Sequence, residues 1–568
     1  MKNIYRSILL VSAMVSIVFH TSAQKKQIAQ FEKQIGEAVK KAYPASVRMW
    51  GFDVQQNQRT SAQFSGVVVS ADGYILTAAH TIVPGKNYKV FFPDGKECIA
   101  IALGRIDNPK TPGMPDVGMM KITDKGTWPF AEMGYSNTLV KNEPCISISY
   151  PESLNQNFPT LRLGEIAEVK NTYGFIRSTC KMEPGDSGGP LFDYHGRVVG
   201  LHSAIDVNED QNFEIPVDLY RKYWTALQQE RTYTDFPARQ GSVGTDPLFI
   251  RKERRQSKLH PDFFKIKHKN VAAVSLESTL ENKLQQAQGT LFNFRDGNGK
   301  QRQFILAKNS LLGEDPTLIA DGGISLVFLA SDKANDVTLL EVERPVKGGI
   351  DLNEMVLDSS WVKMGRLIYT KNADGKILPG ILSSSLFGLP KVSSQPYLGA
   401  MVMFNSQPPL FSLIKPNSPA AVAGIKVGDE LLSINGKAIV KASEFAPEMM
   451  KLWPYDEVTV NWKNASGLQS ETFALAAQSQ AVSYHPADKF TGGKSVRRDG
   501  FEQIFAWDAA VPASDCGTPV FDYEGRFLGI NIARFSRTST LCLPAGVISK
   551  FITETLGKSE VRSRKSGV

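Results

Sequence analysis

Cysteine is scarce in this chain, and its few residues are scattered. The 568 residues include seven histidines and five cysteines, which are Cys98, Cys145, Cys180, Cys516 and Cys542. This is not the density of a disulfide-stapled scaffold, and the odd number leaves at least one thiol unpaired or joined to another chain. No Cys-x-x-Cys motif and no cluster of histidine and cysteine occurs, which argues against a zinc site. We therefore expect neither a metal nor a cofactor.

Long apolar runs and dense charge are missing too. No segment after the N-terminal region is long and apolar enough to span a bilayer as a helix, so we expect no transmembrane anchor. The net charge of +8 is modest for this length and is spread out, apart from basic runs at Arg251–Lys258 and in the C-terminal tail. A nucleic-acid surface is usually denser and interleaved with aromatic residues, so we expect no nucleic-acid partner. Both basic runs are interpreted as solvated linker and tail.

The N-terminus has the pattern of a secretory signal. Lys2 and Arg6 precede the apolar run Ile8–Phe19, and Thr-Ser-Ala follows just before Gln24. No cysteine near the cleavage site would carry a lipid. We expect residues 1–23 to be a signal peptide and the mature protein to be exported, either periplasmic or secreted. The alternative is a cytoplasmic protein with a buried N-terminal helix.

What the chain does contain is a series of short runs typical of β-strands. Residues 24–42 first place apolar side chains about one helical turn apart, which predicts a helix. From Ala45 on, the pattern changes to runs such as SVRMWGF and YKVFFPDG, separated by turn residues. Many short strands at that spacing predict a β-barrel or β-sandwich, and the chain length predicts three or more domains.

The stretch Met182–Phe192, MEPGDSGGPLF, places Ser187 in a glycine-rich turn before an apolar strand. A nucleophilic hydroxyl must project from a tight turn, and the backbone N–H groups of Gly185 and Ser187 would converge on an oxyanion. Glycine permits the backbone angles that such a turn requires. The alternative is a glycine-rich hairpin with no chemistry, and partners elsewhere in the chain must decide between the two.

Two further residues have the required chemistry. His80 follows an apolar strand in ILTAAH, and Asp116 opens another in PDVGMMKI. His80 would take the proton from Ser187 and later return it to the leaving amine, while Asp116 would orient the imidazole and stabilise its cation. Taken singly, His80 is compatible with a satisfied core histidine and Asp116 with a turn cap. The order His, Asp, Ser, with each residue at a strand boundary, favours the catalytic interpretation.

These segments resemble a known family. TAAH, PDVGMMKI and GDSGGPLF are similar to three signature segments of trypsin-like serine proteases, and SGVVVSADGYILTAAHTI is most similar to the HtrA/Deg branch. The resemblance implies a double β-barrel over about residues 45–228, with the three residues as a catalytic triad in the cleft between the barrels. One departure is Asp186, where Deg proteins usually carry Asn. Lys181, near the expected specificity pocket, could favour an acidic residue before the scissile bond.

The same pattern returns after a polar linker. QFILAKNSLL aligns with GYILTAAHTI, NDVTLLEV with PDVGMMKI, and SDCGTPVF with GDSGGPLF. The residues at the three triad positions of this second copy are Ser310, Asp336 and Cys516. A thiol nucleophile needs a base or a lowered pKa, and Ser310 cannot supply the base, so we expect this copy to be inactive. One hypothesis is that Cys516 forms a disulfide with Cys542 and that this disulfide occupies the inactive site.

An insertion interrupts the second copy between Gly380, which matches Gly164 of the first, and Cys516. It holds YLGAMVMF and PNSPAAVAGIKVGDELLSINGKAI, which look like a PDZ domain of the HtrA type. The resemblance assigns a carboxylate-binding loop, whose N–H groups hold a peptide C-terminus, to Tyr397, Leu398, Gly399 and Ala400. The alternative is a PDZ domain that only packs against its host.

The expected fold is mainly β, with two trypsin-like double β-barrel domains and one PDZ domain inserted in the second. In chain order, the expected segments are a signal peptide (1–23), an active protease domain (24–230), a linker (231–262), a degenerate protease domain (263–395 and 479–557) interrupted by the PDZ domain (396–478), and a basic tail (558–568).

The sequence therefore favours an exported serine endopeptidase that cleaves polypeptides, with PDZ-assisted recognition of peptide C-termini. That its substrates are unfolded or damaged envelope proteins, and that it forms a homo-oligomer, are implied by the resemblance alone. One alternative is a processing protease with few substrates. The other is a non-proteolytic peptide-binding or chaperone protein with a latent protease site.

Overall fold

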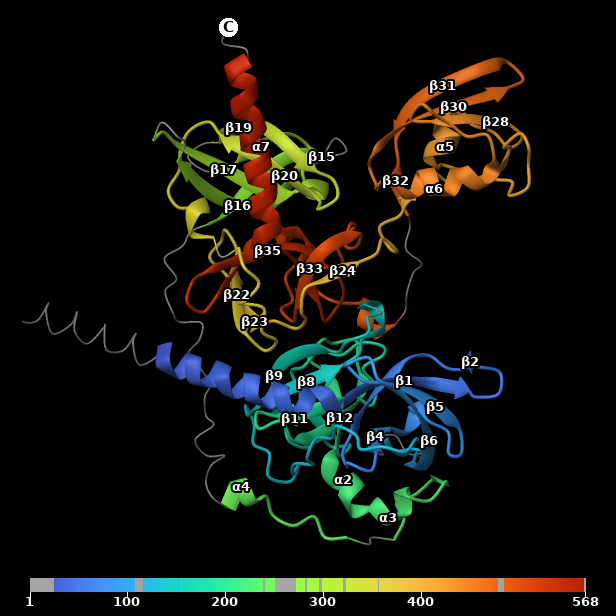
Figure 1. Cartoon of the computed structure of the whole chain (residues 1–568), viewed down its shortest axis with the longest axis vertical. Coiled ribbons are helices and arrows are strands. Elements are labelled where there is room, and N and C mark those ends of the chain that lie inside the picture. Colours follow the sequence, from blue (N-terminus) through green and yellow to red (C-terminus); the bar gives the residue numbers. More distant parts are fainter. Residues whose placement is uncertain are drawn as a thin grey trace, which may run out of the picture.

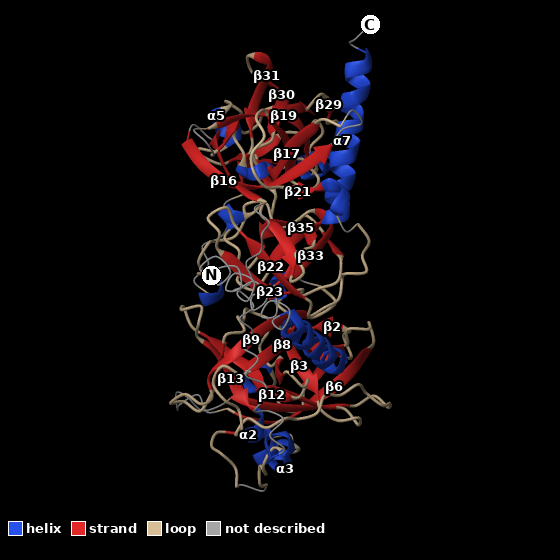
Figure 2. Ribbon diagram, turned by 90° about the vertical axis from the view of Figure 1, so that its left-hand side faces the viewer, coloured by secondary structure: helices blue, strands red, loops and turns tan. Residues whose placement is uncertain are grey.

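The computed structural model of the chain is an elongated stack of β-barrels (Figure 1). It describes residues 25–107, 116–154, 156–238, 241–250, 272–280, 283–295, 299–319, 323–355, 357–478 and 485–565. The signal-peptide prediction and the basic run at 251–258 lie outside these residues. Figures 1 and 2 show two halves placed end to end, with a smaller β domain beside the second. The predicted fold class, mainly β with two double-barrel domains and a PDZ domain, is confirmed.

The first barrel is a closed ring of six antiparallel strands in the order β1-β3-β4-β7-β6-β5. Its strands are β1 (Ser46–Asp53), β3 (Phe64–Val68), β4 (Tyr74–Ala78), β5 (Asn87–Phe91), β6 (Glu97–Ile106) and β7 (Val117–Ile122), with β2 (Gln58–Arg59) as an outlying hairpin on β1. Side chains alternate between the core and the outside along β6, as the period of a strand requires. The inward set forms a closed apolar core.

The second barrel of this half is also closed, in the order β8-β9-β10-β13-β12-β11. Its strands are β8 (Pro144–Ser149), β9 (Thr160–Glu168), β10 (Ile176–Ser178), β11 (Pro190–Asp193), β12 (Val198–Ile205) and β13 (Asn212–Pro216). The short helices α2 (Val217–Lys222) and α3 (Trp224–Leu227) follow it, where one closing helix was predicted. Tyr223 breaks the helix between them because its backbone leaves the helical region.

The second half repeats this connectivity. Its first barrel closes in the order β15-β16-β17-β20-β19-β18, so that the six strands follow one another around the ring in the same way as before. The strands are β15 (Ala273–Leu280), β16 (Lys283–Arg295), β17 (Gln301–Lys308), β18 (Glu314–Leu318), β19 (Ile324–Asp332) and β20 (Val337–Val342), and β21 (Ile350–Asp351) pairs with β16 in parallel.

The second barrel of this half has the order β23-β22-β34-β35-β36-β33, and a bridge between Leu382 and Trp507 joins its ends. The strands are β22 (Leu367–Lys371), β23 (Ile377–Ile381), β33 (Phe501–Trp507), β34 (Pro519–Asp522), β35 (Phe527–Arg534) and β36 (Thr540–Pro544), with β24 (Phe387–Leu389) added on β33. The long helix α7 (Ala545–Lys565) packs on this barrel and continues into the segment that was predicted to be a basic tail.

The inserted domain lies between β24 and β33. Its elements are β25 (Pro396–Tyr397), β26 (Ala400–Val402), β27 (Phe411–Ile414), α5 (Pro419–Val422), β28 (Glu430–Ile434), β29 (Lys437–Ala438), α6 (Phe445–Met450), β30 (Glu457–Asn464), β31 (Gly467–Ala474) and β32 (Ala476–Ala477). It has an apolar core of its own. None of the helices that the structure describes is long and apolar enough to cross a bilayer.

The helix predicted from residues 24–42 is present over 25–42 and lies between the two halves (Figure 1). Its buried face, with Ile35 and Val39, shares one core cluster with Leu367 of the second half. Glu32 accepts a hydrogen bond from the Leu367 backbone N–H at 2.9 Å. The helix therefore ties the two halves together by packing as well as by hydrogen bonding.

The first part of the predicted linker packs against the first half. β14 (Thr232–Tyr233) pairs with β6 in parallel, and α4 (Pro247–Ile250) follows further on. Between them, the carboxylate of Asp246 is fully buried and accepts two 3.0 Å hydrogen bonds from the Arg197 guanidinium. A buried arginine needs such a partner, and composition alone gives no sign of this long-range contact.

Candidate active site

His80 and Asp116, predicted from separate motifs, meet at the edge of the first barrel. His80 stands in a 3₁₀ turn (Ala79–Thr81) directly after β4, and Asp116 precedes β7, which pairs with β4. Nδ1 of His80 lies 2.5 Å from Oδ2 of Asp116, and the His80 backbone N–H donates to Oδ1 at 2.7 Å. Ser203 on β12 donates its hydroxyl to the same Oδ2 at 3.0 Å. The carboxylate therefore fixes both the ring and the backbone of the histidine.

The electrostatics of His80 follow from this contact. Burial by itself would lower the pKa of the imidazole, because it disfavours the cation. The hydrogen bond and the negative charge of Asp116 act in the opposite direction and prevail, so the pKa of His80 is raised. An imidazole with its Nδ1 held by a carboxylate presents Nε2 as the nitrogen that can accept a proton.

Ser187 and His80 line one cavity of about 470 Å³ between the two barrels, together with Gly185, Ser203 and Ile205. Within the described part of the chain, no hydrogen bond joins the Ser187 hydroxyl to the imidazole. Catalytic hydrogen bonds are often long in the absence of substrate and tighten when it binds. The two side chains are thus brought to the same cavity without being locked to each other.

The backbone of the turn leaves two donors available. Among the residues that the structure describes, none accepts a hydrogen bond from the N–H of Gly185 or of Ser187. The carbonyl of Pro184 accepts from the Glu152 N–H at 2.8 Å, and a trans peptide points the following N–H the opposite way. Gly185 has φ +97°, and a Cβ there would lie 2.5 Å from backbone atoms of Glu152 and Tyr150. Only glycine fits this position.

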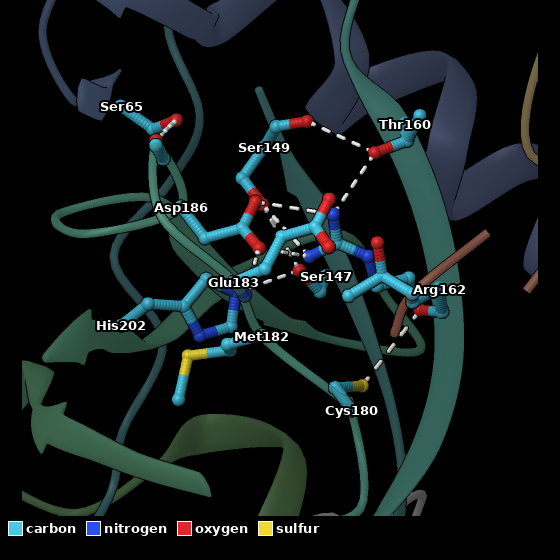
Figure 3. A network of polar contacts seen from close by, with 12 residues as sticks. Ser65, Ser147, Ser149, Thr160, Arg162, Cys180, Met182, Glu183, Asp186 and His202 are labelled. Atoms are coloured by element: carbon cyan, nitrogen blue, oxygen red, sulfur yellow. Dashed lines mark hydrogen bonds and ion pairs between the residues drawn. The ribbon is translucent and has the colours of Figure 1, made fainter. Parts of the chain in front are cut away.

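Asp186 lies inside the protein, beneath the turn (Figure 3). Its carboxylate receives two hydrogen bonds from Arg162 on β9, at 2.8 and 3.1 Å, and one from the Ser149 hydroxyl at 2.8 Å. It also accepts the Glu183 backbone N–H at 2.9 Å. Asp186 and Arg162 are both almost fully buried. The residue between Gly185 and Ser187 is therefore held from below by an ion pair.

A second histidine of the cavity wall, His202, has a structural environment. It is fully buried, its Nε2 lies 2.6 Å from the Ser147 hydroxyl, and its Nδ1 lies 3.7 Å from the Glu214 carboxylate. Burial lowers the pKa of His202 to about 3, so the ring is neutral at ordinary pH. Burial also raises the pKa of Glu214 well above its usual value, although the Ser178 hydroxyl donates to it at 2.5 Å.

The prediction that Lys181 reads an acidic substrate residue is not supported by its surroundings. Its ammonium forms an ion pair with the carboxylate of Glu209, in the loop between β12 and β13. Neither residue lines the cavity that holds Ser187, whose walls include the apolar side chains of Met182 and Ile205. A lysine whose charge is already compensated offers little to a substrate carboxylate.

Among the described residues of the second half, the three matching positions do not form a comparable site. Asp336 is fully buried and is engaged by the Lys308 ammonium, by the Ser310 backbone N–H at 2.8 Å and by the Ser310 hydroxyl at 2.9 Å. Cys516 is fully buried, and burial raises the pKa of its thiol, with the charge of Lys308 acting against this. Arg534, the last residue of β35 where β12 has Ile205, is buried as well and donates to backbone carbonyls.

The disulfide suggested for Cys516 and Cys542 is not formed. All five cysteines are free and buried. The Cys542 thiol lies 3.3 Å from the Asn531 side-chain oxygen, and the Cys516 thiol lies 3.7 Å from the Ser495 hydroxyl. Both thiols are thus accommodated by neighbouring polar groups within the barrel.

The proposed carboxylate-binding loop of the inserted domain runs from β25 into β26. Leu398 is buried, Tyr397 and Ala400 are partly buried, and Gly399 has φ +74° and would place a Cβ 2.1 Å from Ser418. No group among the described residues accepts the backbone N–H of Leu398 or Gly399. β26 pairs with β27 on one side, and the described strands do not pair with its other edge.

Sequence reasoning missed three residues that shape these sites. Arg162 and Ser203 act through contacts that are remote in sequence, and no motif marks them. Lys308 did carry a signal, because it stands where the first copy has Ala78 in TAAH. A lysine at an inward position just before the histidine position predicts a buried carboxylate partner.

Comparison with known proteins agrees with this geometry. The trypsin-like peptidase domain family matches residues 64–201, and the PDZ domain family matches residues 410–446. A probable periplasmic serine endoprotease DegP-like of Pseudomonas savastanoi pv. phaseolicola is 32% identical over 192 residues, covering 32% of this chain and 38% of the relative. Serine protease HTRA1 of Xenopus laevis is 31% identical over 199 residues, covering 33% of this chain and 42% of the relative.

These alignments are partial. The chain spans 27% to 38% of the length of the first three curated relatives it matches. Among solved structures, the serine endoprotease from Yersinia pestis aligns at 16% identity over 78% of this chain and 97% of that chain, with a TM-score of 0.29. This chain combines a trypsin-like peptidase domain with a PDZ domain, and its relatives are serine proteases of the DegP and HtrA kind.

Proposed function

We propose that the chain is an exported serine endopeptidase whose first half hydrolyses peptide bonds. One observation carries the proposal. A carboxylate-held imidazole, a serine hydroxyl and two backbone N–H groups that have no partner among the described residues all meet at one cavity between two barrels. Acyl transfer needs these four elements together.

The chemistry assigns a role to each group. His80 accepts the proton of the Ser187 hydroxyl as oxygen attacks the substrate carbonyl, and then gives that proton to the leaving amine. Asp116 keeps the Nδ1 proton in place and stabilises the imidazolium, which agrees with the raised pKa of His80. The N–H groups of Gly185 and Ser187 stabilise the tetrahedral oxyanion. Water then attacks the acyl enzyme by the same route.

The substrates that we propose are unfolded or damaged proteins of the cell envelope. The N-terminal signal pattern and the similarity to relatives described as periplasmic support an exported enzyme. We assign recognition of peptide C-termini to the PDZ domain, because two N–H groups of its loop and the neighbouring edge of β26 have no partner among the described residues. In this proposal the second half does not catalyse the reaction. Cys516, which stands at the nucleophile position, is buried, and Asp336 forms an ion pair with Lys308.

The test is hydrolysis of denatured casein by the full chain and by two single variants. We expect Ser187→Ala to abolish hydrolysis and Cys516→Ala to leave it unchanged. Absence of hydrolysis by the wild type would instead favour a non-proteolytic peptide-binding or chaperone protein. Profiling the wild type on a peptide library then distinguishes a broad protease from a processing protease with few sites.

A further inference from the structure

The second half contacts the walls of the candidate active site through the loop between β35 and β36. Arg537 in this loop is fully buried, yet its guanidinium donates to the first half. Nη2 donates to the Glu209 carbonyl at 3.0 Å and to the Asn212 side-chain oxygen at 3.4 Å, and Nη1 lies 3.5 Å from the Asp206 carbonyl. All three acceptors belong to the segment that follows Ile205 of the cavity wall.

Asn212 connects this guanidinium to the stretch Met182–Ser187, which we call the catalytic turn. Its side-chain oxygen, the same atom that Arg537 approaches, accepts the backbone N–H of Met182 at 3.1 Å. Met182 begins the stretch that carries Ser187 and itself lines the cavity. One side-chain amide therefore lies between an arginine of the second half and the backbone of the turn.

The neighbouring residue reaches the turn directly. Ser536 donates its hydroxyl to Oε1 of Glu183 at 3.2 Å. The backbone of Glu183 is in turn bonded to Asp186 in both directions, through its N–H to the carboxylate at 2.9 Å and through its carbonyl to the Asp186 N–H at 3.1 Å. Two consecutive residues of the second half thus hold two consecutive residues of the turn.

A third contact fixes the same loop from another direction. The Thr491 backbone N–H donates to Oε1 of Glu209 at 2.6 Å, and Glu209 is also the partner of Lys181. Burial lowers the pKa of the Arg537 guanidinium, and the carboxylates of Glu209 and Glu183 act against this by favouring the charged form. Every hydrogen bond that the structure gives the Arg537 side chain goes to the first half, so its burial is not explained by the fold of its own domain.

We propose that the degenerate second half is a built-in clamp, in which Arg537 and Ser536 are positioning residues for the catalytic turn of the first half. The clamp holds the turn and the 206–212 loop in the arrangement that leaves the N–H groups of Gly185 and Ser187 unpaired. This inference rests on the proposed function, because it assigns the second half a part in that same reaction. Neither residue touches the substrate.

The test compares full-length variants in kcat, in KM and in the rate at which a fluorophosphonate labels Ser187. We expect Arg537→Ala to lower kcat by about 10- to 100-fold with a smaller change in KM, since misplacement of a catalytic group by about 1 Å costs this much. Labelling should slow in parallel. Arg537→Lys should recover part of kcat, because an ammonium still donates to one of the carbonyls.

Two further variants keep the test decisive. Ser536→Ala removes a single hydroxyl and should lower kcat several-fold with little effect on folding, even if Arg537→Ala folds poorly. Arg302→Ala is the matched control, because that arginine forms an ion pair with Glu341 inside the second half. Its kcat should equal that of the wild type.

The outcomes separate the two proposals. A wild type that neither hydrolyses casein nor reacts with the fluorophosphonate overturns the proposed function, and this inference with it. A wild type that is active, with Arg537→Ala and Ser536→Ala equally active or more active, overturns the clamp alone.

Discussion

The guanidinium of Arg162 and the carboxylate of Asp186 form a buried two-pronged ion pair, 2.8 and 3.1 Å long, directly beneath the turn that carries Ser187. Ser149 adds a third hydrogen bond to the same carboxylate. Asp186 is the residue between the two proposed oxyanion donors, so the pair fixes the backbone that must present them.

The first prediction concerns the ion pair of Arg162 and Asp186. Arg162→Ala leaves the Asp186 carboxylate buried without its cation, which should cost about 3–5 kcal/mol of unfolding free energy. The folded fraction should in addition lose about 100-fold in kcat, because the turn is no longer held from below. Denaturant unfolding and active-site titration measure the two effects separately.

The matched control for this prediction is another buried ion pair of the same half. Arg197 bonds to Asp193 and Asp246, away from the cavity. Arg197→Ala should destabilise the protein to a similar extent while kcat per titrated site stays near the wild-type value. Equal losses of kcat in both variants would show that the Arg162 effect is only one of stability.

The motifs predicted the triad candidates because each is encoded locally. His80, Asp116 and Ser187 each stand at a strand boundary that the hydrophobic pattern marks, and the strand pairing then brings the first two together. The duplication was predictable for the same reason, since three ordered segments recur. The identical connectivity of the barrels in the two halves agrees with that alignment.

What sequence reasoning missed depends on contacts across the fold. Arg162 is one of several polar residues on a strand, and only the packing of β9 beneath the turn gives it Asp186. Asp246 lies in a stretch with the composition of a linker, and its contact with the buried Arg197 joins residues that are remote in sequence. Lys181 has the right charge and position for a specificity residue, but a glutamate from a different loop neutralises it.

The second prediction concerns pH. His80 must be neutral to accept a proton, and Asp116 raises its pKa above the ordinary value of about 6.5. The rate constant kcat/KM should therefore fall as the pH drops through a pKa above that value. In Asp116→Asn the acid limb should move to lower pH, and kcat should fall by about 10⁴-fold because the imidazole loses its orienting partner. A pH profile that is unchanged in this variant would argue against His80 as the base.

The third prediction concerns the joint between the PDZ domain and its host. The Arg497 guanidinium lies 3.4 Å from the centre of the Trp453 ring, and the Lys391 ammonium lies 4.0 Å from it. Each such contact is worth about 0.5–2 kcal/mol. Trp453→Ala should therefore loosen the domain, seen as a larger radius of gyration by X-ray scattering. Val422→Ala, at an exposed site of the same domain, should leave the radius unchanged.

The fourth prediction concerns Asp508, which connects the halves by accepting the backbone N–H of Leu163 at 2.8 Å and that of Ile381 at 2.7 Å. Burial raises the pKa of this carboxyl to about 6, against the lowering effect of the two hydrogen bonds. The folded state therefore holds the proton more tightly than the unfolded state, whose carboxyl titrates near 3.9. The contribution of Asp508 to the unfolding free energy is therefore fully present below about pH 4 and is lost as the pH rises through about 6.

Asp508→Asn tests whether stability falls as the pH rises, because an amide resembles the protonated acid and does not titrate. Relative to the wild type, the variant should gain about 1–3 kcal/mol of unfolding free energy between pH 4 and pH 7. Denaturant unfolding at a series of pH values measures the difference. If the unfolding free energies of the variant and the wild type instead run parallel over this range, Asp508 is ionised in the folded protein throughout. Its charge would then be balanced by the two N–H donors and by Arg162, and not neutralised by a proton.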